Sequence, residues 1–243
     1  TVRDGQCNIS LGTSGTVFIP CGAPDGESGS GLHFFAHANG RWHRMGCILS
    51  AASANRWWIE DILRSGDYEG ETAGAQRFLA ENSVFFLPYL SGERSPINAV
   101  RARGCFLGLS AQTTRAQMSL AVLEGVSFAL KSCLEIARAE GAQCTLATVC
   151  GGGAKSALWR KILANVLDLP VAVPVTEQGP ALGAAILAMT GCGVYPDVVS
   201  AADAFARTGE TVMPDPALAA RYAERYAVYA RLYPALKGMF PLM

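Results

Sequence analysis

The sequence predicts an α/β fold in which a mixed sheet is flanked by helices. The opening stretch NISLGTSGTVFIP (residues 8–20) reads as two short strands around a compact turn. Later in the chain, strand-like and helix-like segments alternate, which is typical of α/β proteins. Hydrophobic residues make up 50% of the 243 residues and charged residues only 16%, so the chain can bury a substantial core. No repeat or linker divides it, and we expect one domain.

The first half of the chain is expected to contribute short strands and two helices. Residues 22–31 are rich in Gly, Ser and Asp and predict a mobile surface loop. Apolar alternation and helical periodicity predict the remaining elements. In order, these are strands at 32–38 and 41–46, helices over Ser50–Leu63 and Thr72–Asn82, a strand at 84–90, a loop at 91–96 and a strand at 104–109.

The second half contains the strongest helical pattern. Apolar residues recur at helical spacing from Thr114 to Glu140, and Gly141 follows as a stop signal. A strand at 145–150 then leads through three glycines into another helix with an apolar stripe, which Pro170 ends. The stripe consists of Leu158, Trp159, Ile162, Leu163, Val166 and Leu167. The remaining expected elements are a strand at 171–175, a Gly-Pro turn at 179–180, a helix over Ala181–Met189 and a terminal helix over Pro216–Leu236.

Charge and hydropathy argue against several classes of protein. Twenty basic and twenty acidic residues are spread without blocks, which gives no footprint for nucleic acid or an anionic membrane surface. The longest apolar passage, 181–194, is interrupted by glycines and falls short of the roughly 20 residues that cross a bilayer. Eight cysteines without a C-x-x-C pair indicate reduced core residues. No signal peptide is visible, so we expect a cytoplasmic protein.

Other chemistry-bearing residues favour structural roles. On a strand His33 and His37 would lie about 13 Å apart, which disfavours a zinc site built from the clustered histidines. The adjacent Trp57 and Trp58 are expected in the core. The turn sequence GTSGT does not match the G-x-S-x-G of a hydrolase. For Glu93 and Glu124 we expect ion pairing, with Arg94 the obvious neighbour of the former.

Two turns have the composition of anion-binding sites. The glycines at 151–153 lie between a strand and a helix, where backbone N–H groups and the helix N-terminus could meet a phosphate or nucleoside. The turn is neither a Walker A loop nor a G-x-G-x-x-G fingerprint, and a tight packing turn stays an open alternative. The Gly-Thr-Ser-Gly turn at 12–15 can aim several donors at one anion, although an ordinary hairpin turn has the same residues.

Gly104-x-Phe106-x-Gly108-Leu109 is separated by seven residues from QMSLAVLE at 117–124. This spacing fits, without a mismatch, the second signature pattern of the FGGY family of carbohydrate kinases, and the chain resembles the C-terminal half of that family. The resemblance extends over nearly all 243 residues. It includes GTSG, FLPYLSGERSPINAVRARGCFLGLS, CGGGAKSALWRKILANVLDLPV and EQGPALGAAILA.

This resemblance implies an actin-like (ribonuclease H-like) ATPase fold, two domains that close on a cleft, and transfer of the γ-phosphoryl group of ATP, with Mg²⁺, to a sugar hydroxyl. Within the family it is strongest to the members that convert D-xylulose to D-xylulose 5-phosphate. Kinases of glycerol, ribulose or gluconate stay open as alternatives, as does a nucleotide-binding module without catalysis.

The resemblance also implies which residues contact the nucleotide. The first turn would lie against the phosphates and the second would border the adenosine, with its glycines allowing close approach to the main chain. Ala52 and Arg56 fall where glycerol kinases carry Gly and Gln. The complete expected set is Gly12, Thr13, Ser14, Gly15, Ala52, Arg56, Gly152, Gly153, Ala154, Lys155 and Ser156.

By the same resemblance, residues 1–243 form the C-terminal nucleotide-binding domain, and the sugar-binding N-terminal domain lies outside this sequence. The catalytic aspartate base is then expected upstream of Thr1, because Asp4 is too close to the hairpin. Expected partners are ATP or ADP, the sugar through the other domain, and a second copy in a homodimer, but neither nucleic acid nor membrane. The cleft face of the domain should be unusually apolar.

Overall fold

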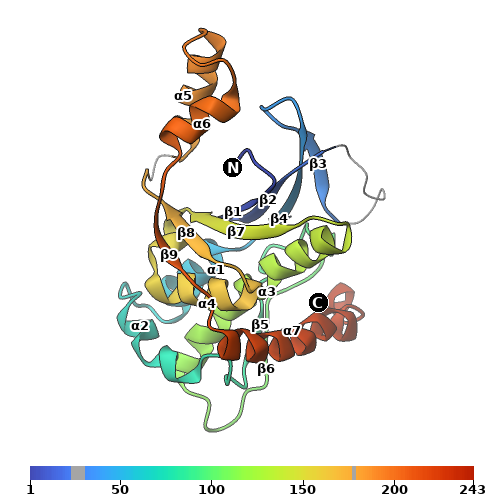
Figure 1. The fold of residues 1–243 in the computed structure, drawn as a ribbon. Coiled ribbons are helices and arrows are strands. Elements are labelled where there is room, and N and C mark those ends of the chain that lie inside the picture. The colour runs from blue at the N-terminus through green and yellow to red at the C-terminus, as the bar shows by residue number, and fades with distance from the viewer. Residues whose placement is uncertain (23–30, 177–178) are drawn as a thin grey trace.

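A seven-stranded mixed sheet forms the centre of the protein (Figure 1). The computed structural model describes residues 1–22, 31–176 and 179–243. The strand order is β3-β4-β2-β1-β7-β8-β9, and β5 and β6 form a separate pair. The strands are β1 (Gly5–Leu11), β2 (Gly15–Cys21), β3 (His33–Ala36), β4 (Trp42–Ile48), β5 (Phe85–Leu87), β6 (Cys105–Leu107), β7 (Cys144–Cys150), β8 (Val171–Pro174) and β9 (Thr208–Val212).

Strand pairing brings the two turns of the sequence analysis to the same edge of the sheet. β1 and β2 form the predicted antiparallel hairpin, with Leu11 opposite Gly15. β1 also pairs in parallel with β7, with Ile9 opposite Val149. Both β1 and β7 therefore end at the same side, and the turns that follow them are neighbours. The mixed sheet is confirmed.

Helices cover the lower face of the sheet in Figure 1. α3 and α4 lie directly beneath it, and α7 packs below them. The helices are α1 (Ala52–Arg56), α2 (Gly70–Ala73), α3 (Arg115–Ala139), α4 (Ala157–Leu167), α5 (Gly179–Gly191), α6 (Val198–Phe205) and α7 (Pro216–Leu236). α3 begins at a capping box between Thr114 and Gln117, as its sequence favours. The buried stripe of α4 and the bounds of α7 are as predicted.

Two predicted helices and one predicted turn differ from the structure. α1 is short and continues as a π-helix over Trp57–Ile62. In place of the helix predicted over Thr72–Asn82, α2 is followed by a 3-10 helix over Gly74–Phe78. The helix does not continue to Asn82 because Ala80 adopts a left-handed φ of 58° and the Asn82 side chain accepts a hydrogen bond from the Val84 N–H. The Gly-Pro pair at 179–180 opens α5 instead of forming a turn. Proline is well suited to a first helical turn, which explains this outcome.

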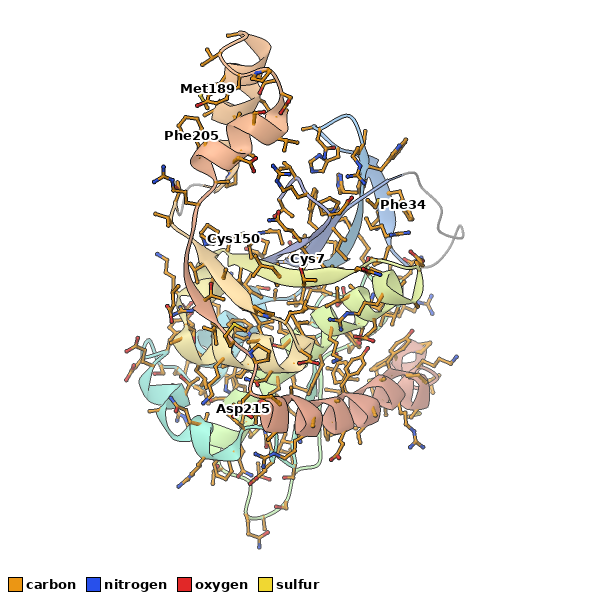
Figure 2. The ribbon with its side chains drawn as sticks, viewed as in Figure 1. Cys7, Phe34, Cys150, Met189, Phe205 and Asp215 are labelled. Carbon is orange, nitrogen blue, oxygen red and sulfur yellow. The ribbon has the colours of Figure 1, made fainter. Side chains whose placement is uncertain are left out.

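α5 and α6 project from the opposite side of the sheet and have a small apolar cluster of their own (Figure 1). The cluster is built on Ile186, Ala201 and Ala202. In Figure 2, Met189 and Phe205 lie on this projection, well away from Cys7 and Cys150 on the sheet. Neither α6 nor β9 was predicted, and the loop predicted over 22–31 lies, at 23–30, outside the described residues.

Buried side chains confirm two further predictions. Trp58 lies in the core, and its neighbour Trp57 packs against the core but is only partly buried. Five of the eight free cysteines are buried. No helix in the described part of the chain is long and apolar enough to cross a membrane.

Candidate functional site

The hairpin turn at 12–14 is fixed to the start of α1 through its carbonyl groups. The Gly12 carbonyl accepts a hydrogen bond from the Ala52 N–H at 2.8 Å. The Thr13 carbonyl accepts one from the Ala51 N–H at 3.0 Å and one from the Ser53 hydroxyl at 2.6 Å. With its carbonyls engaged by the helix, the turn can present its N–H groups and the Thr13 hydroxyl elsewhere.

The glycine turn packs directly against the end of β1. A Cβ atom at Gly151, where φ is 90°, would lie 2.7 Å from the main-chain carbonyl of Leu11. A Cβ at Gly153 would lie 2.9 Å from both the Leu11 Cβ and the Trp159 ring. At Gly152 an added Cβ would meet no atom within 4 Å. Two of the three glycines are thus required by packing between the turns, and only Gly152 has open space beside it.

The N-terminus of α4 holds the glycine turn from the other side. The Ser156 hydroxyl caps the helix by accepting a hydrogen bond from the Trp159 N–H at 3.2 Å. The Arg160 guanidinium donates to the carbonyls of Ala154 and Lys155 at 2.9 and 3.1 Å. The turn is therefore held from both ends, which pre-organises its backbone.

A third wall comes from the segment around α2, which sequence reasoning missed. Tyr68 donates a hydrogen bond to Glu60 at 2.7 Å, and desolvation together with this bond raises the pKa of Tyr68 to about 12. An ion pair between Arg115 and Glu71 joins α2 to the start of α3. Little in the sequence marks this wall of the cavity, because the segment is short and polar and its contacts depend on the tertiary structure.

These elements enclose a cavity of about 590 Å³, within the usual range for small-molecule sites. It is lined by Thr13, Ala52, Ser53, Asn55, Arg56, Tyr68, Glu69, Thr72, Ala73, Gln76, Leu123, Gly152, Gly153, Lys155, Ser156, Ala157, Leu158 and Trp159. The structure thus brings together seven of the eleven predicted residues, and these come from three separate stretches of chain.

Four predicted residues lie beside the cavity without lining it. They are Gly12, Ser14, Gly15 and Ala154. Gly15 has a packing role, since a Cβ there would lie 2.9 Å from Ile48 and 3.0 Å from Ala51. Ala154 is buried, and the main chain of Gly12 bonds to α1. These residues shape the two turns.

The buried glutamates Glu93 and Glu124 do not line the cavity. Glu124 forms the predicted ion pair, with Arg225 at 2.9 Å, and accepts a hydrogen bond from Tyr222; burial nevertheless raises its pKa to about 7. For Glu93 the expected pairing with Arg94 is wrong, because its carboxylate accepts from the backbone N–H groups of Leu49 and Arg94, each at 2.8 Å. Burial raises the pKa of Glu93 to about 7.

A comparison with known families agrees with this geometry. The family described as "FGGY family of carbohydrate kinases, C-terminal domain" matches residues 7–192. The chain belongs to the FGGY family. The xylulose kinase of Escherichia coli K12 is 36% identical over 247 residues, which cover 100% of this chain and 50% of that protein.

Solved structures of FGGY kinases share the fold. A xyloylose kinase from Brucella ovis has a TM-score of 0.90 at 38% identity, covering 98% of this chain and 49% of its own. A gluconate kinase from Lactobacillus acidophilus has a TM-score of 0.87 at 25% identity, with coverage of 99% and 49%. The fold is therefore the actin-like ATPase fold. This chain spans about half the length of the relatives it matches.

Proposed function

We propose that this chain is the nucleotide-binding half of an ATP-dependent sugar kinase that phosphorylates D-xylulose. The observation that carries the proposal is the shared cavity between the Thr13 turn and the Gly152 turn. A nucleoside triphosphate needs donors for its phosphates and an apolar surface for its base. The first turn offers hydroxyl and N–H donors, and Leu123, Leu158 and Trp159 offer the apolar wall.

The residues of this chain would bind and position the nucleotide while another part of the protein carries the sugar and the base. Phosphoryl transfer depends mainly on positioning and charge stabilisation, with a carboxylate that takes the hydroxyl proton. Among the described residues that line the cavity, Glu69 is the one carboxylate. Asp4 is exposed and pairs with Arg41 at 3.0 Å. We therefore place the base outside this chain, in the domain proposed to precede it.

Mg²⁺ is expected for such a reaction, and the described part of the chain contains no cluster of protein ligands for it. Across residues 1–22, 31–176 and 179–243, no group of three or more His, Cys, Asp or Glu side chains could hold a metal ion. A magnesium ion usually keeps several waters and binds through substrate phosphates. Any Mg²⁺ would accordingly depend on the bound nucleotide.

The sugar is the least constrained part of the proposal. Xylulose is favoured by the xylulose kinase of Escherichia coli K12 at 36% identity, and D-gluconate is the second candidate because the gluconate kinase shares the fold at 25% identity. Glycerol and ribulose complete the set of substrates to compare.

The test uses the complete gene product that contains this chain. Calorimetric titration should detect ATP binding, and Thr13→Val should abolish it, because valine has the shape of threonine without the hydroxyl. A coupled assay over D-xylulose, D-ribulose, D-gluconate and glycerol should give the highest kcat/KM for D-xylulose. Unchanged ATP affinity in Thr13→Val would overturn the assignment of the site, and ATP binding without transfer to any sugar would indicate a non-catalytic module.

A further inference from the structure

Glu93 is a buried carboxylate that ties a loop to the chain at the end of β4. Its side chain is 1% exposed, and its Oε1 accepts hydrogen bonds from the N–H groups of Leu49 and Arg94, each at 2.8 Å. Its Oε2 is buried and has no hydrogen-bond partner among the residues that the structure describes. A buried carboxylate that is only half satisfied costs free energy, so we expect Glu93 to have a role that an apolar side chain could not fill.

The main chain of the loop fixes the position of Glu93. Glu93 and Ala99 exchange two backbone hydrogen bonds, in which the Glu93 N–H donates at 2.9 Å and the Ala99 N–H at 2.8 Å. The Ser95 N–H donates to the carbonyl of Cys47 on β4 at 3.0 Å. The backbone of Glu93 is thus held without help from its carboxylate, which presents a fixed acceptor to Leu49.

Leu49 is the first residue of the connection from β4 to α1. The pairing of β4 with β2 ends at Ile48, which lies opposite Gly15. The Leu49 N–H therefore lies beyond the strand ladder, and the carboxylate of Glu93 satisfies it instead. Glu93 fixes the chain at the point where it leaves the sheet.

The residues that follow Leu49 hold the hairpin turn of the candidate site. In the described part of the chain no side chain caps the N-terminus of α1. The N–H groups of Ala51 and Ala52 donate instead to the carbonyls of Thr13 and Gly12, at 3.0 and 2.8 Å. The turn and the start of α1 therefore hold each other, and a shift of the chain at Leu49 would be passed to the turn.

We propose that Glu93 is a positioning residue for the nucleotide, which acts through Leu49 and the start of α1 to hold the Thr13 turn in the geometry that meets the phosphates. The inference rests on the proposed function, which assigns the phosphates to this turn. Glu93 itself would not touch the nucleotide, because it does not line the cavity. Without Oε1 the Leu49 N–H would lose its acceptor, and the chain between β4 and α1 would shift to satisfy it.

The test compares Glu93→Leu with Glu93→Gln in the complete gene product. Leucine is similar in size but offers no acceptor, so ATP affinity should fall about tenfold. Glutamine keeps an acceptor oxygen, so its ATP affinity should stay within about twofold of the unsubstituted protein. Titration calorimetry with ATP, at a temperature at which each variant is folded, measures both. Unchanged affinity in Glu93→Leu, or equal losses in the two variants, would overturn the inference.

Asn165→Leu is the matched control for a general loss of stability. Asn165 is also 1% exposed, and its side chain accepts a hydrogen bond from the Asp215 N–H at 2.8 Å, but it does not line the cavity. Asn165→Leu and Glu93→Leu should both lower the melting temperature, because each removes a buried acceptor from a backbone N–H. Only Glu93→Leu should weaken ATP binding. An equal loss of ATP affinity in Asn165→Leu would overturn the inference.

Ser53 supplies a readout that a purely structural role of Glu93 would not move. The Ser53 hydroxyl donates to the Thr13 carbonyl at 2.6 Å and so holds the same turn. Ser53→Ala should weaken ATP binding about threefold, and its loss should not multiply with that of Glu93→Leu in the double variant, because both act on one turn. A double variant with the full product of the two losses would overturn the inference. Failure of the unsubstituted protein to bind ATP would instead overturn the proposed function.

Discussion

At the scale of single residues, the three consecutive glycines have different roles. Gly151 and Gly153 lack a side chain because the end of β1 occupies the space. Gly152 lines the cavity with open space beside it and is the glycine at which a ligand could approach the main chain. Gly152 and Gly153 both line the cavity, but only Gly152 could carry a side chain without an internal clash.

Gly152→Val and Gly153→Val should consequently fail in different ways. Gly152→Val should weaken ATP binding at least tenfold with little change in the free energy of unfolding, because its side chain would compete only with the ligand. Gly153→Val should destabilise the fold by about 2 kcal/mol or more, since its Cβ would overlap Leu11 and Trp159. Calorimetry with ATP and chemical denaturation measure the two effects. Equal destabilisation in both variants would contradict this assignment.

Glu93 should make stability depend on pH. Its pKa is about 7 in the folded protein, because burial disfavours the charged form, and about 4.3 in an unfolded chain. The folded state therefore retains a proton that the unfolded state has lost. The stabilisation of the folded state by this proton is fully present below about pH 4.3 and is lost as the pH rises through 7.

Glu93→Gln should flatten the resulting profile. In the unsubstituted protein we expect the free energy of unfolding to fall between pH 5 and 8 by on the order of 1–3 kcal/mol. Part of that fall should remain in Glu93→Gln, because the pKa of Glu124 is raised in the same way. Urea denaturation over this pH range measures the effect, with the exposed Glu81→Gln as the control. A steeper fall in Glu93→Gln would contradict the expected sign.

At the scale of elements, α4 determines the position of the glycine turn. Arg160 connects the carbonyls of Ala154 and Lys155 to β9, where its guanidinium pairs with Glu210 at 2.9 Å. Glu210 is exposed, so its pairing with Arg160 should contribute little. The bonds to the carbonyls should matter more, because they hold the main chain of the turn.

Arg160→Met should therefore weaken ATP binding about three- to tenfold, with a loss of about 1 kcal/mol in stability. Glu210→Gln, which removes only the ion pair, should change ATP affinity less than twofold. Titration calorimetry of both variants checks the difference. Comparable losses of affinity in the two would show that the ion pair, and not the carbonyl bonds, positions the turn.

The sequence identified the elements with long or strongly patterned segments. α3, α4 and α7 have sustained apolar periodicity and clear end signals, and their bounds agree closely with the prediction. The segments after residue 50 were harder because a π-helix, a four-residue helix and a 3-10 helix have no distinct period in the sequence. α6 was missed because it is only eight residues long.

The residues of the candidate site also divide into those that a sequence pattern marks and those that no pattern marks. Thr13 and Gly152 were predicted because the composition of their turns allows anion binding and the resemblance to the FGGY family assigns these turns to the nucleotide; both line the cavity. Asn55 also lines the cavity, from α1, but carries no motif that marks it in the sequence. Tyr68 and Gln76 reach the cavity through tertiary contacts of a short polar segment, which no local pattern encodes.

At the scale of the whole molecule, α5 is the most unusual surface. The helix is apolar along nearly its whole length, yet Ile186 is its one buried residue among those described. Leu187 is 49% exposed, and Val194 and Phe205 nearby are also exposed. An apolar surface of this kind usually marks an interface. We expect it to pack against the second domain that the length of the relatives suggests.

Leu187→Glu should then destabilise the complete gene product. Burying a charge at a domain interface costs several kcal/mol, so the melting temperature should fall by at least about 5 °C. Val228→Glu is the control, because Val228 is 47% exposed on α7, a helix on the opposite side of the sheet. Differential scanning calorimetry compares the two. Equal melting temperatures in both variants would argue against an interface on α5.

The overlap between a Cβ at Gly153 and the side chain of Leu11 also constrains how the family can vary. The clash would be with the Leu11 Cβ, which every residue except glycine carries, and with the Trp159 ring, so a smaller side chain at position 11 would not relieve it. Leu11→Ala should therefore fail to rescue Gly153→Ala, and relatives that keep a side chain at position 11 should keep glycine at 153. Two positions more than 140 residues apart would then be constrained by a single pair of atoms.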